Sequence, residues 1–145
     1  RALPFTDAVI KESMRLYPPV WAVGRLTTAP VEVGGVEVPA GTQILMPQWV
    51  VHRDPRWFAD PLVFRPERWL DGGPAQLPRH AYFPFGGGPR ICVGNHFARL
   101  ESIILVACWL RRFSLTPVPG FVPELLPSAT LRATHGVRVV LTRRG

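Results

Sequence analysis

The sequence lacks the features of secreted, disulfide-bonded and membrane-spanning proteins. It holds two cysteines in 145 residues, which is too few for a disulfide framework. It opens without an initiator methionine, and no apolar signal-peptide core follows. The longest apolar run, from Ile103 to Leu110, is too short to span a bilayer. We therefore expect a soluble cytoplasmic chain, or the soluble part of a longer protein whose missing N-terminus leaves a membrane anchor open.

Acidic residues and lysine are also scarce. The chain has 10 Asp and Glu against 17 basic residues, of which Lys11 is the single lysine, and its formal net charge is +7. The arginines are scattered and no nucleic-acid-binding motif accompanies them, so we do not expect a nucleic-acid partner. An acidic protein partner would suit this charge. The preference for arginine over lysine hints at a GC-rich bacterial genome.

The chain does have enough apolar sequence for one domain, with 47% hydrophobic residues. The fold class that we expect is α+β and mainly helical. One helix is predicted over residues 6–17, with Thr6 or Asp7 as its cap and Pro18-Pro19 as its end. A second helix is predicted over residues 95–112. Its second half is nearly all apolar, which predicts a buried core helix.

Short strands and loops are expected around these two helices. The alternating residues of 31–38 around Gly34-Gly35 predict a hairpin. The other segments are expected to be an extended run over 20–26, a strand over 42–46, a short helix over 47–52, an irregular proline-aromatic segment down to Trp69, a loop over 71–77, a strand over 113–115, and a final hairpin in which Leu131 and 137–141 flank the turn 134–136.

The most informative stretch is residues 83–94, which contain the spacing F-x-x-G-x-R-x-C-x-G. Cys92 stands near the expected start of a helix, whose positive end favours a thiolate. The glycines of this stretch allow φ > 0 and the close approach of a flat group. Arg90 offers a forked donor that suits a carboxylate, and Phe85 offers an apolar wall. The pattern therefore predicts a loop that presents Cys92 as an anionic ligand.

Other interpretations of this cysteine stay open. The plainest is an inert buried cysteine in a glycine turn before a helix. Cys92 and His96 form half of a zinc site, although no second pair completes it, and a nucleophilic Cys92 could use His96 or His80 as base. Cys108 lies about 24 Å further along the helix, too far for a disulfide or a shared metal, so we expect a buried small hydrophobe there. His52 and His80 are expected to be structural.

The stretch 83–94 resembles the cysteine-ligand loop of the cytochrome P-450 family, the haem-thiolate monooxygenases. Residues 11–19 look like the E-x-x-R helix of the same family. Taken alone, Glu12 and Arg15 stand three apart and would form a surface ion pair of small energy. The resemblance instead implies a buried structural network that Arg68 joins, which would hold the loop leading to Cys92.

The resemblance also implies the ligands and their sites. Cys92 would be the axial ligand of the iron of haem b, held noncovalently because no C-x-x-C-H is present. The other expected haem-binding residues are Phe85, Gly86, Arg90, Ile91 and Gly94, with Arg25 reaching a propionate. The residues expected to face substrate are Val20, Trp21 and Val23, for which strand packing is the alternative, and Ala129.

By this resemblance, residues 1–145 are the C-terminal haem-binding part of a single P-450 domain whose N-terminal part is absent. The full-length protein would insert one oxygen atom of O₂ into a small apolar substrate. Electrons would come from NAD(P)H through a ferredoxin or a flavoprotein reductase. The long helix that delivers protons to oxygen lies outside the chain, so no catalytic residue beyond the haem ligand is expected. The alternatives are a non-catalytic haem-thiolate sensor or carrier, and a truncated inactive fragment.

Overall fold

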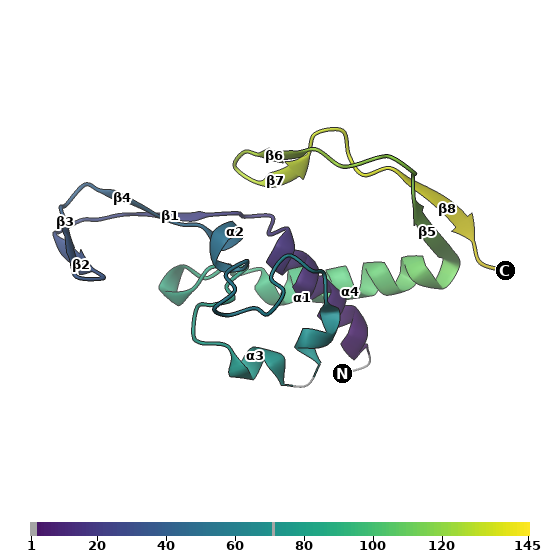
Figure 1. Cartoon of the computed structure of the whole chain (residues 1–145), viewed down its shortest axis with the longest axis horizontal. Coiled ribbons are helices and arrows are strands. Elements are labelled where there is room, and N and C mark those ends of the chain that lie inside the picture. Colours follow the sequence, from purple (N-terminus) through teal and green to yellow (C-terminus); the bar gives the residue numbers. More distant parts are fainter. Residues whose placement is uncertain (1–2, 71) are drawn as a thin grey trace.

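The computed structural model describes residues 3–70 and 72–145, which form two long helices and four two-stranded antiparallel sheets that extend away from the helices on two sides (Figure 1). The elements are, in order, α1 (Pro4–Leu16), β1 (Val23–Leu26), β2 (Val31–Val33), β3 (Val36–Val38), β4 (Gln43–Met46), α2 (Gln48–Val51), the 3₁₀ turn η1 (Pro66–Trp69), α3 (Gly73–Gln76), the 3₁₀ turn η2 (Gly88–Arg90), α4 (Asn95–Arg112), β5 (Phe113–Pro117), β6 (Leu125–Pro127), β7 (Leu131–Ala133) and β8 (Val139–Arg143).

Helix α1 begins two residues earlier than predicted. A proline occupies its first turn, where a missing N–H costs no hydrogen bond, and no side chain caps the helix. The expected caps Thr6 and Asp7 therefore lie inside the helix, and that prediction is wrong. Asp7 instead pairs with Lys11 at 3.0 Å and with Arg99 of α4, so it fastens the two long helices together. Helix α4 has the predicted bounds, Asn95–Arg112.

The strands pair in twos within the described part of the chain. The hairpin β2–β3 around Gly34-Gly35 is confirmed, and β4 returns to pair with β1. The predicted final hairpin is wrong: β7 pairs with β6, while β8 passes on and pairs with β5. The chain passes through the turn at Gly136 and returns alongside β5, so that β8 pairs with all five residues of β5, whereas β6 and β7 pair over three.

The predicted loop over 71–77 is wrong in part. Asp71 lies outside the described residues, but Gly73–Gln76 forms the short helix α3. Gly72 precedes it with φ +70°, a left-handed conformation that suits glycine, and a proline follows in the first turn. The glycine turn and the proline in the first helical turn together start a helix. In the sequence alone, the same glycines and proline indicate a loop.

The buried core of the described residues is small. The buried hydrophobic side chains are Ala8, Leu16, Phe58, Trp69 and Ala81. Of these, Ala8, Phe58 and Trp69 form one cluster, with Leu77 and Tyr82 packed against it. Ala8 belongs to α1 and Trp69 to η1, and these two elements pack against each other. The core therefore lies between α1 and the irregular segment, on the route that leads to the cysteine loop.

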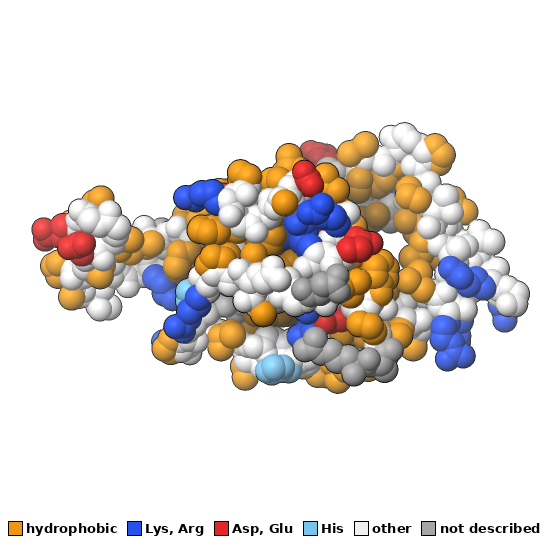
Figure 2. All heavy atoms as spheres, turned by 60° about the horizontal axis from the view of Figure 1, so that its bottom comes forward, with side chains coloured by type: hydrophobic (Ala, Val, Ile, Leu, Met, Phe, Trp, Pro, Cys, Tyr) orange, Lys and Arg blue, Asp and Glu red, His pale blue; other side chains and the backbone are white. Residues whose placement is uncertain are grey.

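Helix α4 is not a core helix in this chain, which corrects the prediction. None of its residues is buried, Phe97 is 71% exposed, and Cys108 is exposed rather than buried. The accessible surface is 10495 Å², against roughly 7,500 Å² for a compact monomer of this mass. Figure 2 shows hydrophobic side chains spread over one face of the molecule. The apolar side chains of α4, which led us to predict a buried helix, are therefore not covered by the other described residues.

Over residues 3–70 and 72–145, no helix combines the length and the apolar character needed to cross a bilayer.

Candidate functional site

The cysteine loop is closed on itself by backbone hydrogen bonds. The N–H of Cys92 donates to the carbonyl of Phe85 at 2.9 Å, and the N–H of Gly86 donates to the carbonyl of Phe83 at 2.9 Å. Gly86 has φ +74° and Gly88 has φ +70°, conformations that a side chain would strain. The two glycines thus allow the tight path that brings residue 85 back to the cysteine.

Cys92 itself is a free, exposed thiol on an open apolar surface. It stands three residues before α4, and its carbonyl accepts the N–H of Asn95 at 3.3 Å. Val93 is fully exposed, Ile91 is 49% exposed, and a Cβ on Gly94 would lie 3.8 Å from the sulfur. The site thus has a thiol beside a helix N-terminus, exposed apolar side chains on either side of it, and no side chain at residue 94. These features fit a flat apolar metal cofactor.

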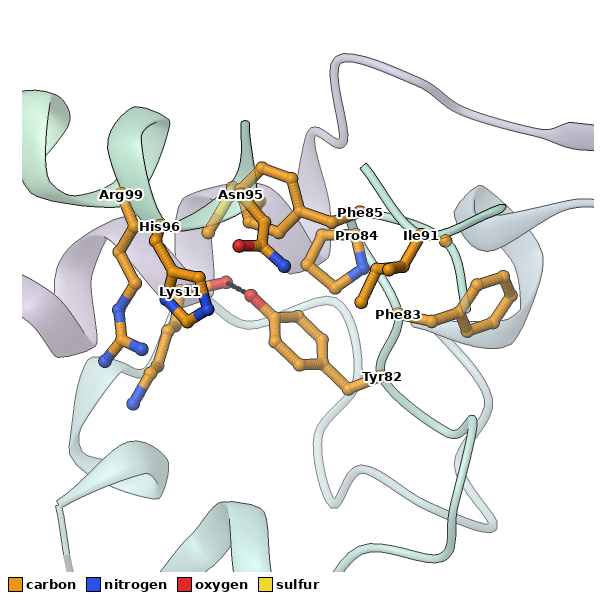
Figure 3. Close-up of a pocket in the computed structure, with 11 residues that line it drawn as sticks. Lys11, Tyr82, Phe83, Pro84, Phe85, Ile91, Asn95, His96 and Arg99 are labelled. Carbon is orange, nitrogen blue, oxygen red and sulfur yellow. Dashed lines mark hydrogen bonds between the residues drawn. The ribbon is translucent and has the colours of Figure 1, made fainter. Parts of the chain in front are cut away.

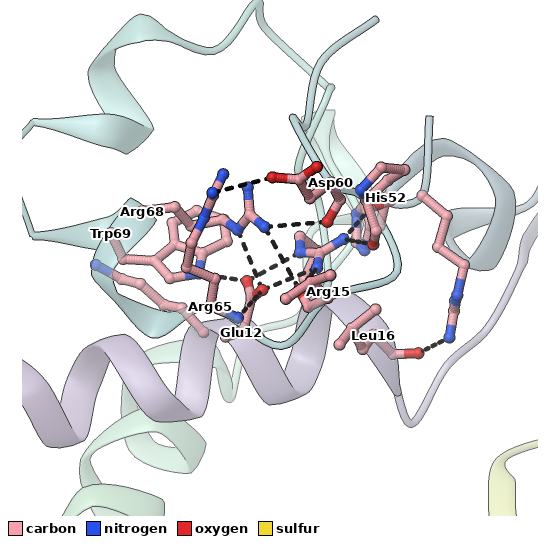
Figure 4. A network of polar contacts seen from close by, with 12 residues as sticks. Glu12, Arg15, Leu16, His52, Asp60, Arg65, Arg68 and Trp69 are labelled. Atoms are coloured by element: carbon pink, nitrogen blue, oxygen red, sulfur yellow. Dashed lines mark hydrogen bonds and ion pairs between the residues drawn. The ribbon is translucent and has the colours of Figure 1, made fainter. Parts of the chain in front are cut away.

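A second feature, the carboxylate of Glu12, lies fully buried on α1 and receives five hydrogen bonds (Figure 4). Arg15 donates through two nitrogens at 2.9 and 2.8 Å, and Arg68 donates through Nε at 3.1 Å. The structure thus brings Glu12, Arg15 and Arg68 together. Burial alone would raise the pKa of Glu12, but the bonds from Arg15, the Arg65 N–H and Trp69 outweigh it and lower that pKa.

Two of these donors were missed by the sequence analysis. They are the backbone N–H of Arg65 at 2.9 Å and the indole N–H of Trp69 at 2.8 Å. Trp69 carried a usable signal, because a buried tryptophan normally needs a partner for its N–H. The Arg65 donor is a backbone group, and its residue type carries no signal.

Arg15 extends the network into the irregular segment before η1. Its fully buried guanidinium also donates to the carbonyls of His52 at 2.8 Å, Pro61 at 2.6 Å and Val63 at 3.2 Å. Charge-assisted bonds of this kind are about twice as strong as neutral ones. The network therefore fixes a segment that has little regular structure of its own.

A cavity of about 250 Å³ separates α1 from the cysteine loop (Figure 3). Tyr82 and Lys11 both line this cavity, and the hydroxyl of Tyr82 donates to the carbonyl of Lys11 at 3.0 Å. Burial raises the pKa of Tyr82, so its hydroxyl stays protonated as a donor. The side chains of Phe85 and Ile91 also line this cavity. The inner side of the cysteine loop thus faces α1, while its sulfur is exposed.

The remaining expected site residues are exposed or half-buried. Arg25 on β1 donates to its neighbour's carbonyl, and in residues 3–70 and 72–145 neither Arg25 nor Arg90 forms an ion pair. Val20 is 39% exposed, and Val23 is half-buried at the start of β1. Ala129 is exposed in the turn between β6 and β7.

Trp21 joins two distant parts of the chain. Its indole N–H donates to the carbonyl of Ser128 at 2.7 Å, in the turn that also holds Ala129. Together with Trp49 it lines an apolar cavity of about 410 Å³, and Leu125, Pro127 and Leu131 form the other side of that cavity. The structure therefore brings one expected substrate-facing residue, Trp21, beside the segment that carries another.

The expected structural histidines differ from one another. His52 is fully buried, and its Nε2 accepts the N–H of Phe83 at 2.9 Å. His80 is exposed and takes φ +68°, and its ring lies against Gly87, where a Cβ would come within 3.1 Å. Over the described ranges, no group of three or more His, Cys, Asp or Glu side chains is arranged to hold a metal ion.

Comparison with known proteins gives the context of this site. The family model described as Cytochrome P450 matches residues 1–138. The chain is 45% identical over 119 residues to cyclooctat-9-en-7-ol 5-monooxygenase of Streptomyces melanosporofaciens, covering 82% of this chain and 26% of that protein. It is 44% identical over 142 residues to cytochrome P450 4d2 of Drosophila melanogaster, covering 98% of this chain and 28% of that protein.

Solved structures agree in fold. The retinoic acid-bound cyanobacterial CYP120A1 superposes with a TM-score of 0.90 at 34% identity, over 97% of this chain and 33% of that one. The structure of CYP102L1 gives a TM-score of 0.86 at 29% identity, over 97% and 32%. The chain spans about a third or less of these proteins, and the expected α+β, mainly helical class is confirmed. The chain therefore belongs to the cytochrome P450 family and is a C-terminal portion of its fold.

Proposed function

We propose that the full-length protein is a haem-thiolate monooxygenase in which Cys92 is the axial ligand of the iron. The observation that carries this proposal is the free, exposed thiol of Cys92, whose backbone N–H is bonded to the carbonyl of Phe85 in a glycine–arginine loop immediately before α4. When bound, a haem with a thiolate ligand supplies O₂ activation, because the sulfur donates electron density that favours O–O cleavage. In this proposal, residues 1–145 are the haem-binding part of a single domain.

The residues of the loop would hold the ligand and the cofactor in distinct ways. The bond from the Cys92 N–H to Phe85 sets the position of the sulfur, and the positive end of α4 favours its negative charge. Gly86 and Gly94 leave room for the macrocycle, while Phe85 and Ile91 supply apolar contact. The side chains of Arg90 and Arg25, without acidic partners among the described residues, would bind the propionates of haem b, held noncovalently.

The substrate in this proposal is a small apolar organic molecule. Val20, Trp21, Val23 and Ala129 would contact it, and the apolar cavity beside Trp21 supports that choice. The name of the Streptomyces relative, a monooxygenase of cyclooctat-9-en-7-ol, supports the same class of reaction. NAD(P)H would supply electrons through a ferredoxin or a flavoprotein reductase, in a bacterial cytoplasm.

The experiment uses the full-length protein with haem and a suitable reductase. We expect the carbon monoxide difference spectrum of a thiolate-ligated ferrous haem, and substrate-dependent NAD(P)H consumption that places one atom of ¹⁸O₂ in the product. The spectrum without turnover would instead support the haem-thiolate sensor. Absence of the thiolate spectrum would contradict the assignment of Cys92.

A further inference from the structure

Side chains at the short helix α2 form hydrogen bonds to the backbone of Phe83, in the segment that leads into the cysteine loop. Gln48 and His52 stand four apart, on one face of the helical turn, and both side chains are fully buried. The Nε2 of Gln48 donates to the carbonyl of Phe83, and the N–H of Phe83 donates to Nε2 of His52 at 2.9 Å. Both backbone polar groups of Phe83, which lies outside regular secondary structure, are thus bonded by side chains of α2 and of its C-cap residue, His52.

Phe83 stands at the base of the cysteine loop. Its carbonyl accepts the N–H of Gly86 at 2.9 Å as well as the amide of Gln48. Two residues further on, the carbonyl of Phe85 accepts the N–H of Cys92 at 2.9 Å. A shift of Phe83 would therefore move the acceptor that holds Cys92.

The same turn of α2 is anchored on its other side. The carbonyl of His52 accepts a hydrogen bond from the buried guanidinium of Arg15 at 2.8 Å. The ring of His52 packs against Tyr82 and Phe83, with centroid distances of 5.1 and 5.3 Å. Helix α2 thus lies between the Glu12–Arg15 network and the cysteine loop, in contact with both.

We propose that Gln48 and His52 are positioning residues for Cys92: by fixing both backbone groups of Phe83, they set the base of the cysteine loop. This inference rests on the proposed role of Cys92. His52 can act only as the neutral ring with Nε2 as acceptor. Burial, together with the charge of Arg15, keeps the pKa of His52 at about 4, so this form prevails at neutral pH.

The test is hydrogen exchange of the backbone amides in residues 80–93 of the full-length protein. In His52→Leu, the amide of Phe83 should exchange at least about tenfold faster, because tenfold corresponds to about 1.4 kcal/mol, within the cost of one unsatisfied buried N–H. The amide of Cys92, which His52 does not touch, should also exchange faster. Gln48→Met, which keeps the shape but removes the donor, should have the same effect on Cys92.

Two variants separate positioning from simple packing. His52→Gln keeps an acceptor near the position of Nε2 and should restore slow exchange at both amides. His135→Leu, at an exposed histidine beyond β7, should change neither. In wild-type protein that shows the thiolate spectrum, His52→Leu and Gln48→Met should lose this spectrum at lower denaturant concentration, and His52→Gln should not.

Either of two results would overturn the inference. One is faster exchange at Phe83 with no change at Cys92 in both His52→Leu and Gln48→Met. The other is His52→Gln behaving like His52→Leu, which would make the ring a packing group only. Because exchange needs no thiolate–iron bond, these results are distinct from a failure of the proposed function, which would appear as a missing thiolate spectrum in the wild-type protein.

Discussion

Replacing Glu12 by alanine removes a carboxylate that no water reaches and that five donors share. Glu12 and Arg15 both have 0% exposure, and the closest contact between them is 2.8 Å. The guanidinium of Arg15 would keep its three carbonyl acceptors but lose its only countercharge in direct contact among the described residues. The indole N–H of Trp69 and the backbone N–H of Arg65 would lose their acceptor as well.

The expected cost follows from this burial. Breaking a buried pair by removing one partner costs about 3–5 kcal/mol, because the remaining charge is left uncompensated. Proteins have about 5–15 kcal/mol of unfolding free energy, so Glu12→Ala should remove a large fraction of it. An exposed ion pair is typically worth less than about 1 kcal/mol.

The assay is denaturant unfolding of the full-length protein, with haem content measured beside it. Arg65→Ala is the matched control, since it removes an exposed pair with Asp60 while keeping the N–H that donates to Glu12. Arg65→Ala should therefore cost under about 1 kcal/mol. A loss below about 1 kcal/mol for Glu12→Ala, with normal haem content, would refute the buried network as a determinant of stability.

Two further predictions concern acid and the isolated chain. The pKa of His52 is about 4 in the folded protein against 6.5 for a free ring, so the unfolded state binds more protons between these values. The free energy of unfolding should fall by up to ~3 kcal/mol as the pH drops from about 6.5 to 4. In urea unfolding of His52→Gln, this part of the dependence of the free energy on pH should be missing. An equal pH dependence in His52→Gln and the wild-type protein would contradict the prediction. Residues 1–145 expressed alone with haemin should aggregate or bind haem without turnover, because α4 is uncovered. A soluble monomer with substrate turnover would disprove that.

Local patterns in the sequence predicted the elements that depend on local chemistry. Residues 95–112 combine an apolar stretch with basic residues at the end, a pattern typical of a helix, and α4 has these bounds. The glycine pair at 34–35 was sufficient to predict the hairpin β2–β3. The meeting of Glu12 with Arg68 was expected only through a family resemblance, since a separation of 56 residues carries no periodic signal.

What the sequence did not predict depends on which segments meet in space. The pairing of β8 with β5 is decided by where the chain returns after the turn at Gly136. The donor at Arg65 is a backbone N–H, and Gln48 and His52 bond to the backbone of Phe83. All residue types except proline carry both of these backbone groups, so the residue type gives no signal. The exposure of α4 could not follow from its composition, because an apolar helix predicts burial without saying what covers it.

The most direct test of the central claim is the carbon monoxide difference spectrum of Cys92→Ser in the full-length protein. Cys108→Ser is the matched control, because Cys108 is also a free, exposed cysteine but stands about four helical turns away. We expect Cys92→Ser to abolish the spectrum of a thiolate-ligated ferrous haem, and Cys108→Ser to keep it. Retention of that spectrum in Cys92→Ser, or its loss in Cys108→Ser alone, would contradict the assignment of Cys92 as the iron ligand.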